Sequence, residues 1–205
     1  MVKDGIYYGL GLSAAGLLIT FVFSAYWAIP LFILAAFCLW FFRDPERVAP
    51  DGPIAVSPAD GKVTHIRDFP DGGVRVSIFL NIFNVHVNRT PVGGRITEVQ
   101  YKSGRFKMAH LEEASERNEQ NTLVVQPDDQ RSGPVEFKQI AGLVARRIVC
   151  HKRVGDTLSK GERFGLIKFG SRMDVRFGPE WELTVAKGDK VSAGATPIAR
   201  LKDSA

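Results

Sequence analysis

The chain has 205 residues, a formal net charge of +5 and a sequence pI near 9.3. This length suits one domain with an appendage and is enough to bury a sizeable core. The positive charge favours an anionic partner, such as a nucleic acid or a lipid surface. The two cysteines, Cys38 and Cys150, make no disulfide framework, so a disulfide-stapled secreted fold is excluded and a reducing compartment is expected.

The N-terminal part of the chain is apolar. From Gly5 to Phe42 it carries no charged residue, and a membrane-spanning helix needs about 20 apolar residues. Pro30 and the aromatic residues just before it interrupt this run, so we expect two helical arms, 6–25 and 31–42. The second arm is short, which leaves open whether the hairpin spans the membrane or re-enters it.

The charges that flank this run indicate its orientation. Lys3 precedes it, and Arg43 and Arg47 follow it. Positive charge at both ends favours both ends on the cytoplasmic side. The sequence therefore predicts a hydrophobic membrane-anchor hairpin over residues 1–47, which places the protein at the cell membrane with its remaining domain, 48–205, in the cytoplasm.

Beyond the linker, short runs rich in Val, Ile and Phe alternate with Gly, Pro and Asp. This rhythm is typical of an antiparallel β domain, and one short segment, 110–118, has helix-forming residues. The expected strands are Gly61–Ile66, Gly73–Leu80, Val85–Val87, Arg95–Tyr101, Thr122–Gln126, Val135–Gln139 and Ala145–Val149. The fold class is therefore mainly β, with an N-terminal hydrophobic helical hairpin.

A Gly-Asp-x-apolar-Ser-x-Gly pattern occurs twice, at 155–161 and again at 188–194. The glycines allow tight turns, and the apolar residue between them can enter the core. A unit used twice suggests two hairpin-like halves wrapped into a small barrel or sandwich. The pattern also resembles the turns of lipoyl carrier domains, but no Lys stands in the hairpin position that those carriers modify.

A Gly-Ser pair, Gly170-Ser171, separates two β-type runs, 165–169 and 173–177. A Gly in such a pattern marks a bulge or a close approach to the backbone. With a base in reach, the Ser171 hydroxyl can attack the carbonyl of Gly170 and cut the chain there. The plainer interpretation is a β-bulge with an exposed Ser.

Two residues of the first half are candidates to assist Ser171. Asp60 lies in a Ser-Pro-Ala-Asp-Gly turn before an expected strand, and His86 lies between two valines. In a strand those valines share one face and His86 takes the other, where it can act as a base held by a carboxylate. An ordinary Asp-Gly turn and a structural His are the alternatives. No Cys/His spacing indicates a metal site.

Taken together, these motifs identify a family. The chain resembles the phosphatidylserine decarboxylase proenzymes, in particular their short bacterial and archaeal branch, over essentially its whole length. The matching segments are Phe41-Phe42-Arg43-Asp44-Pro45, Ser57-Pro58-Ala59-Asp60-Gly61, Val85-His86-Val87-Asn88-Arg89, Arg117-Asn118-Glu119, Gln139-Ile140-Ala141-Gly142, Ala145–Val149, and Phe164-Gly165 through Phe169-Gly170-Ser171.

The resemblance implies a self-cleavage reaction. Asp60 orients His86, His86 deprotonates Ser171, and the Ser171 oxygen attacks the Gly170 carbonyl to form an ester. Elimination frees residues 1–170 and leaves a dehydroalanine, whose hydrolysis releases ammonia and leaves a pyruvoyl group at position 171. The chains 1–170 and 171–205 are expected to remain associated, because the smaller one is too short to fold alone.

The resemblance also implies the second reaction, decarboxylation of phosphatidylserine to phosphatidylethanolamine with the pyruvoyl group as electron sink. His86 is the candidate to protonate the substrate carbon. The longer branch has a second His where this chain has Phe83, and many members follow Gly-Ser with Thr or Ser where this chain has Arg172, so roles assigned to those side chains do not carry over.

A lipid surface is then the expected anionic partner, rather than nucleic acid. Four basic residues are the candidates for contact with the headgroup or the membrane, namely Arg43, Arg47, Arg89 and Lys62. The oligomeric state stays open, a dimer included. Three alternatives also remain: a decarboxylase of another serine phospholipid such as an archaetidylserine, a membrane-tethered β-barrel adaptor without activity, and a Ser-His-Asp hydrolase, which the missing Gly-x-Ser-x-Gly elbow disfavours.

Overall fold

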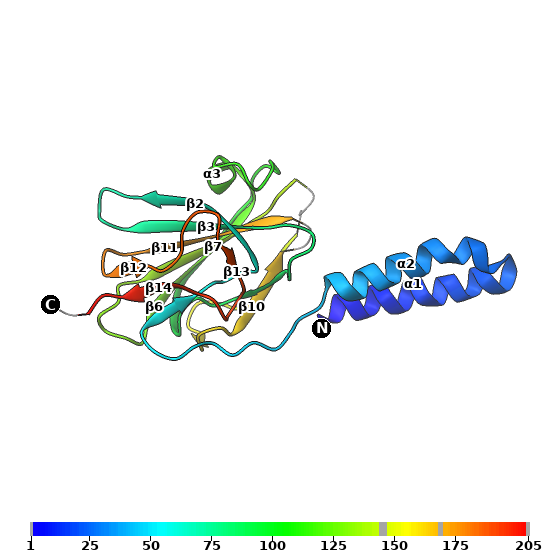
Figure 1. Cartoon of the computed structure of the whole chain (residues 1–205), viewed down its shortest axis with the longest axis horizontal. Coiled ribbons are helices and arrows are strands. Elements are labelled where there is room, and N and C mark those ends of the chain that lie inside the picture. The colour runs from blue at the N-terminus through cyan, green and yellow to red at the C-terminus, as the bar shows by residue number, and fades with distance from the viewer. Residues whose placement is uncertain (1, 144–146, 168–169, 204–205) are drawn as a thin grey trace. The chain divides into compact units, whose positions relative to one another are not determined.

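A computed structural model describes residues 2–143, 147–167 and 170–203. The predicted fold class is confirmed, because the chain is mainly β and carries an apolar helix pair at its N-terminus (Figure 1). The chain divides into two compact units, Met1–Glu46 and Arg47–Ala205. Residues 145–146 of one expected strand and 168–169 of the run before Gly170 lie outside the described residues.

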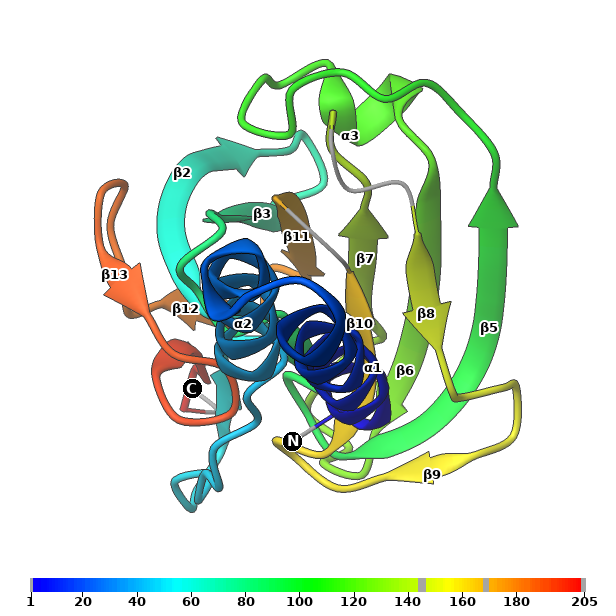
Figure 2. The same ribbon diagram turned by 90° about the vertical axis from the view of Figure 1, so that its right-hand side faces the viewer.

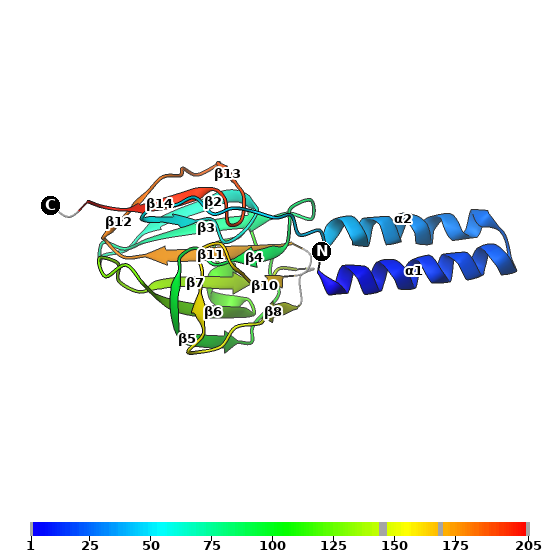
Figure 3. The ribbon, with the colours of Figure 1, turned by 90° about the horizontal axis from the view of Figure 1, so that it is seen from below.

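The N-terminal unit is an antiparallel pair of helices, α1 (Lys3–Val22) and α2 (Ala25–Phe41), which run side by side (Figure 3). Glycines on α1 allow this close packing. A Cβ atom on Gly9 would lie 2.6 Å from the side chain of Leu39, and one on Gly5 would lie 2.4 Å from that of Phe42. The predicted hairpin therefore forms, with a glycine face on α1.

The boundary between the two helices differs from the prediction. Helix α2 begins at Ala25 and contains Pro30, whereas the sequence suggested that the second arm begins after this proline. Apolar helices tolerate an internal proline better than water-exposed ones. Helix α1 is 20 residues long and contains an 18-residue stretch with a mean hydropathy of 1.6, which by length and composition is enough to cross a membrane, and α2 is shorter. This suggests membrane association.

The described residues of the second unit form three antiparallel sheets. The largest has eight strands in the order β13-β2-β3-β11-β7-β6-β5-β9, and the others have the orders β4-β10-β8 and β1-β14-β12. The strands are β1 (Ile54–Val56), β2 (Gly61–Asp68), β3 (Val74–Leu80), β4 (Val87–Arg89), β5 (Gly94–Lys102), β6 (Gln120–Pro127), β7 (Val135–Ile140), β8 (Ile148–Cys150), β9 (Thr157–Leu158), β10 (Arg163–Ile167), β11 (Ser171–Phe177), β12 (Trp181–Leu183), β13 (Lys190–Val191) and β14 (Pro197–Leu201).

The large sheet is strongly curved, and β10 and β8 lie against its concave side (Figure 2). Apolar side chains from both layers fill the space between them and form one core. The rings of Phe137 on β7 and Phe164 on β10, for example, meet edge to face with centroids 5.1 Å apart. The sheet thus forms a curved half-barrel, in agreement with the small barrel or sandwich that the sequence predicted.

The repeated Gly-Asp motifs take equivalent places in this fold. Gly155 donates its amide to the Ile96 carbonyl, and Gly188 donates its amide to the Val63 carbonyl. Each motif then enters a two-residue strand, β9 or β13, and these are the two edge strands of the large sheet. The repeat is therefore structural, since it closes both edges in the same way.

Two predicted elements differ locally. The helical segment 110–118 narrows to one turn, α3 (Ala114–Arg117). His86 was expected inside a strand between two valines, but β4 begins only at Val87. The Asn84 side chain accepts a hydrogen bond from the amide of Asn81, at 2.9 Å, which stabilises a turn directly before His86.

Candidate active site

Ser171 is the first residue of β11, an interior strand of the large sheet that pairs with β3 on one side and β7 on the other. Its side chain is fully buried. Among the residues that the structure describes, its Oγ has no hydrogen-bond partner. A buried hydroxyl without a partner costs about 1–3 kcal/mol, so this position is unfavourable for stability and is consistent with a chemical role.

His86 lies beside the peptide that precedes Ser171. Its Nδ1 is 2.9 Å from the carbonyl oxygen of Asn84, and its Nε2 accepts a hydrogen bond from the amide of Gly170 at 3.3 Å. Since a carbonyl only accepts, Nδ1 carries the proton and the Nε2 lone pair points to the chain at Gly170. The ring is thus fixed in the tautomer that a base at this place requires.

Gly170 itself has a conformation that favours glycine, with φ at +70°. Its carbonyl group lies against Gly142. A Cβ atom placed on Gly142 would lie 2.2 Å from the Gly170 oxygen and 3.3 Å from its carbonyl carbon. Both positions therefore need glycine, Gly170 for its backbone conformation and Gly142 because the carbonyl that would be attacked approaches it closely.

Replacement of Gly142 by alanine is accordingly expected to slow self-cleavage about 100-fold, because the new methyl group displaces the Gly170 carbonyl and misplacement by about 1 Å costs this much. The fraction of cut chain against time, read from denaturing mass spectra, measures this. Gly11→Ala is the matched control, since a Cβ there meets nothing within 4 Å. Equal cleavage rates for the two variants would contradict the role given to Gly142.

Asp60 lies in the turn before β2, and both of its oxygens are engaged. Arg47 binds Oδ2 at 3.1 Å, and the amide of Ala193 donates to Oδ1 at 2.8 Å. The same turn reaches the strand that follows His86, because the Pro58 carbonyl accepts the amide of Arg89 at 2.9 Å. The structure thus connects the Asp60 turn to β4, while His86 Nδ1 donates its hydrogen bond to the Asn84 carbonyl.

Arg172 points away from Ser171, as adjacent residues of a strand do. Its side chain is completely buried. Its guanidinium binds Asp174 Oδ1 at 2.6 Å, Ser77 Oγ at 2.6 Å and the Leu111 carbonyl at 3.0 Å. Burial, and after it the charge of Arg172, lowers the pKa of His65 nearby. Arg172 therefore holds the start of β11 from the opposite face of the sheet.

The four basic residues proposed for lipid contact have different surroundings. Arg47 pairs with Asp60, and the Arg43 guanidinium lies over the Trp40 ring, 4.2 Å from its centroid. Arg89 is buried and donates to the Gly161 carbonyl at 3.0 Å. Lys62 is exposed on β2. Among the described residues of the β domain, none of Arg47, Lys62 and Arg89 is hydrogen-bonded to the Ser171 hydroxyl.

A cavity of about 170 Å³ opens next to Gly170. Gly170 forms part of its wall, and most of the other lining side chains are apolar. They are Phe79, Ile82, Met108, Ala109, His110 and Leu143.

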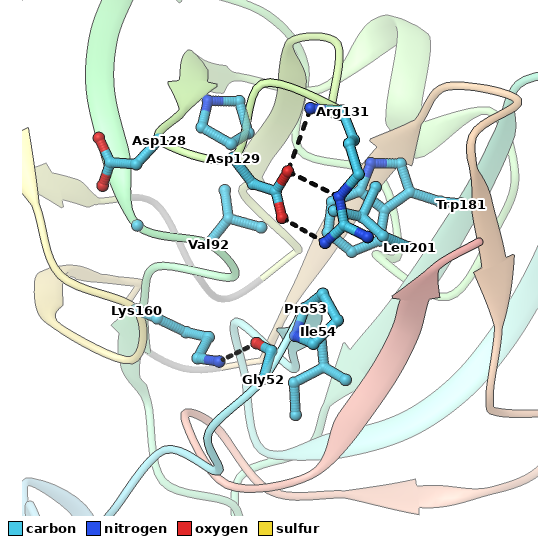
Figure 4. Close-up of a pocket in the computed structure, with 12 residues that line it drawn as sticks. Gly52, Pro53, Ile54, Val92, Asp128, Asp129, Arg131, Lys160, Trp181 and Leu201 are labelled. Atoms are coloured by element: carbon cyan, nitrogen blue, oxygen red, sulfur yellow. Dashed lines mark hydrogen bonds and ion pairs between the residues drawn. The ribbon is translucent and has the colours of Figure 1, made fainter. Parts of the chain in front are cut away.

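A second cavity, of about 290 Å³, lies between the linker and the end of β14 and includes neither His86 nor Ser171 (Figure 4). Hydrogen bonds from Arg131 lower the pKa of Asp129 at its edge to about 2. Lys160 donates to the Gly52 carbonyl there at 3.0 Å. These charges are paired with protein groups, so the cavity adds nothing to the cleavage site.

Sequence reasoning missed two contributors to the site, Asn84 and Gly142. Asn84 acts through its backbone carbonyl, which no side-chain pattern reveals. Gly142 closes one of the segments that match the family, but its role depends on a contact with Gly170 across the fold. The sequence also gave no sign of the apolar cavity, whose lining comes from four separate segments of the chain.

Comparison with known proteins identifies the family of the chain. The family model for phosphatidylserine decarboxylase matches residues 34–199. A phosphatidylserine decarboxylase proenzyme from Solibacter usitatus is 58% identical, over 99% of this chain and 98% of its own. The proenzyme of Syntrophus aciditrophicus is 44% identical, over 97% of this chain and 96% of its own. That of Solidesulfovibrio magneticus is 50% identical, over 80% of this chain and 78% of its own. The chain therefore belongs to the phosphatidylserine decarboxylase family.

Proposed function

We propose that this protein decarboxylates phosphatidylserine to phosphatidylethanolamine and that it first cuts itself between Gly170 and Ser171. Membership of the family supports the reaction, and the name proenzyme that its relatives carry supports processing. One observation carries the assignment of the cut. The unprotonated nitrogen of His86 lies 3.3 Å from the Gly170 amide, next to a buried serine.

His86 and Ser171 make the cut in this proposal. The Ser171 hydroxyl turns toward His86 Nε2, gives up its proton and attacks the Gly170 carbonyl carbon, and the amide nitrogen of position 171 leaves as an amine. The ester so formed joins Gly170 to the Ser171 oxygen. Loss of the Cα proton of Ser171 then breaks the Cβ–Oγ bond, so that the Gly170 carboxylate departs. The product of this elimination is a dehydroalanine at position 171. Its hydrolysis by water releases the nitrogen as ammonia and leaves a ketone.

Asp60 acts as a positioning residue in this scheme. Its carboxylate ties the linker at Arg47 to the turn at Ala193, and its turn is hydrogen-bonded to β4. We propose that this network holds the His86 segment in register with Gly170. The sequence predicted that Asp60 orients the imidazole itself, whereas the described partner of Nδ1 is the Asn84 carbonyl. The role that we propose for Asp60 is therefore on the backbone that carries His86.

The group proposed at position 171 is a pyruvoyl, which accepts electrons as carbon dioxide leaves the substrate. The residues around it fit this group, since Ser171 is buried at the end of an interior strand and Gly170 borders an open cavity. His86 Nε2, after taking up a proton from solvent, is the proposed proton donor to the substrate carbon. Phe83, in the place of the second histidine of the longer branch, is 64% exposed and brings no proton of its own.

The two products of the cut are proposed to stay together. Residues 171–203 contain β11, β12, β13 and β14. Of these, β11 pairs with β3 and β7, β13 pairs with β2, and β14 pairs with β1. Separation would break every one of these ladders and open the core.

The partner we propose is an anionic phospholipid membrane, with the β domain on its cytoplasmic side. The length and apolar composition of helix α1 support the proposed membrane association. The basic residues that flank the helix pair support the proposed cytoplasmic orientation of the β domain. Arg43, Arg47 and Lys62 remain the proposed contacts with lipid phosphates, and burial makes Arg89 the weakest of the four. Another serine phospholipid is the second candidate substrate.

The test is the mass of the purified protein under denaturing conditions together with a lipid assay. We expect two chains instead of one of 22.6 kDa, the smaller beginning at position 171 and blocked to Edman degradation. The same preparation should release carbon dioxide from phosphatidylserine vesicles. A persistently intact chain that is still active would overturn the proposal, and a panel of serine lipids decides between the two substrates.

A further inference from the structure

Five apolar side chains around the cleavage site face solvent. Ile82 is 45% exposed, Met108 52%, Leu111 43% and Leu143 52%, and Phe83 is 64% exposed. We call Ile82, Phe83, Met108, Leu111 and Leu143 the apolar rim. Scattered single apolar residues are common on protein surfaces, but a cluster marks a contact surface. All five belong to the β domain.

Three residues of the rim also line the cavity at Gly170. Ile82, Met108 and Leu143 line both the rim and the cavity, so one apolar surface runs from the outside to the scissile peptide. Inside, the rings of Phe79 and His110 meet edge to face, with centroids 6.0 Å apart. His110 is the one lining residue with an ionisable side chain. Contact with such apolar walls contributes little binding free energy for a charged headgroup alone, whereas a hydrocarbon chain gains about 25 cal/mol of free energy for each Å² of apolar surface that it buries.

We propose that the apolar rim docks onto the lipid bilayer, so that the cavity opens directly into one leaflet. This inference rests on the proposed function. A diacyl lipid whose headgroup must reach position 171 keeps its acyl chains in the bilayer, and the surface at the mouth of the site must therefore meet hydrocarbon. The continuity of the rim with the wall at Gly170 selects the lipid surface over a protein partner.

A label at the rim tests the contact without use of activity. In the full-length protein with Cys38 and Cys150 replaced by serine, an environment-sensitive fluorophore is attached to Leu111→Cys or to Val154→Cys. Val154, which is 58% exposed and outside the rim, is the matched control. In phosphatidylethanolamine–phosphatidylserine vesicles with a quencher on the acyl chains, we expect strong quenching at 111 and little at 154. Equal quenching at both positions would overturn the proposal.

Kinetics provide the second readout. The double variant Phe83→Ser/Leu111→Ser changes two rim residues that do not line the cavity. It should lose about tenfold or more in kcat/KM on vesicles, yet change less than about threefold on monomeric dihexanoyl phosphatidylserine, because only the vesicle reaction needs the docked surface. Val154→Ser should match the unaltered protein in both assays. Equal losses on both substrates would contradict docking.

These outcomes are distinguishable from failure of the proposed function, in which the unaltered chain stays uncut and turns over neither substrate. A second copy of the chain is the other occupant to consider. Quenching between labels at position 111 in detergent without vesicles would show that the rim joins two copies, and it would overturn the lipid assignment.

Discussion

Replacement of Ser171 by alanine should leave one uncut chain without decarboxylase activity. The change removes only an oxygen atom that, within the described part of the chain, makes no hydrogen bond. The fold should therefore keep its stability or gain slightly, since a buried hydroxyl without a partner is unfavourable. Denaturing mass spectrometry, a lipid assay and a thermal unfolding curve measure the three quantities.

A buried serine elsewhere provides the control for this variant. Ser132 donates its hydroxyl to the Gly133 carbonyl and accepts the Trp181 indole N–H at 3.1 Å. Ser132→Ala should lose about 1 kcal/mol of unfolding free energy for these bonds, and yet should be cut normally. If Ser171→Ala still separated into two chains, the nucleophile would have to be another residue.

Replacement of His86 by alanine should slow the cut by about 10²–10⁴-fold, which is the usual contribution of a general base. The variant loses the Nε2 lone pair that lies beside the Gly170 amide and keeps Ser171. A time course of the cut fraction over days measures the residual rate. His151→Ala is the matched control, because His151 is exposed and its backbone amide, not its ring, bonds the Phe164 carbonyl.

The same variant separates the two roles proposed for His86. If it acts only in processing, activity divided by the amount of cut chain should equal that of the unaltered protein. If its Nε2 also protonates the substrate carbon, this ratio should fall as well. Cutting at the normal rate would exclude His86 as the base.

The sequence predicted the helix pair and the β domain because both depend on local patterns. A long charge-free run can only be buried in apolar surroundings, and repeated short β-type runs between turn residues favour antiparallel strands. Pro30 shows the limit of a local rule. The prediction assumed that a proline ends a helix, as it does in water-exposed helices. In this apolar helix Pro30 lies inside α2 instead.

The candidate site was predictable in its residue types but not in its contacts. Strand alternation places Ser171 and Arg172 on opposite faces, and the structure shows them so. By contrast, the tautomer of His86 depends on the Asn84 carbonyl, and the fit of the scissile carbonyl depends on Gly142. Both are settled by how distant segments pack, and that information exists only in three dimensions.

The paired Gly-Asp turns have a consequence for the order of events in the life of the protein. Their final glycines meet, since a Cβ on Gly161 would lie 3.4 Å from the Gly194 oxygen and one on Gly194 equally far from the Gly161 oxygen. Gly161 belongs to the larger product of the cut and Gly194 to the smaller. Before the cut the chain can refold by itself, whereas afterwards two separate molecules must find each other. Under the proposed cut, we therefore expect assembly to precede maturation, and we expect a matured enzyme that melts to refold less well than the uncut chain.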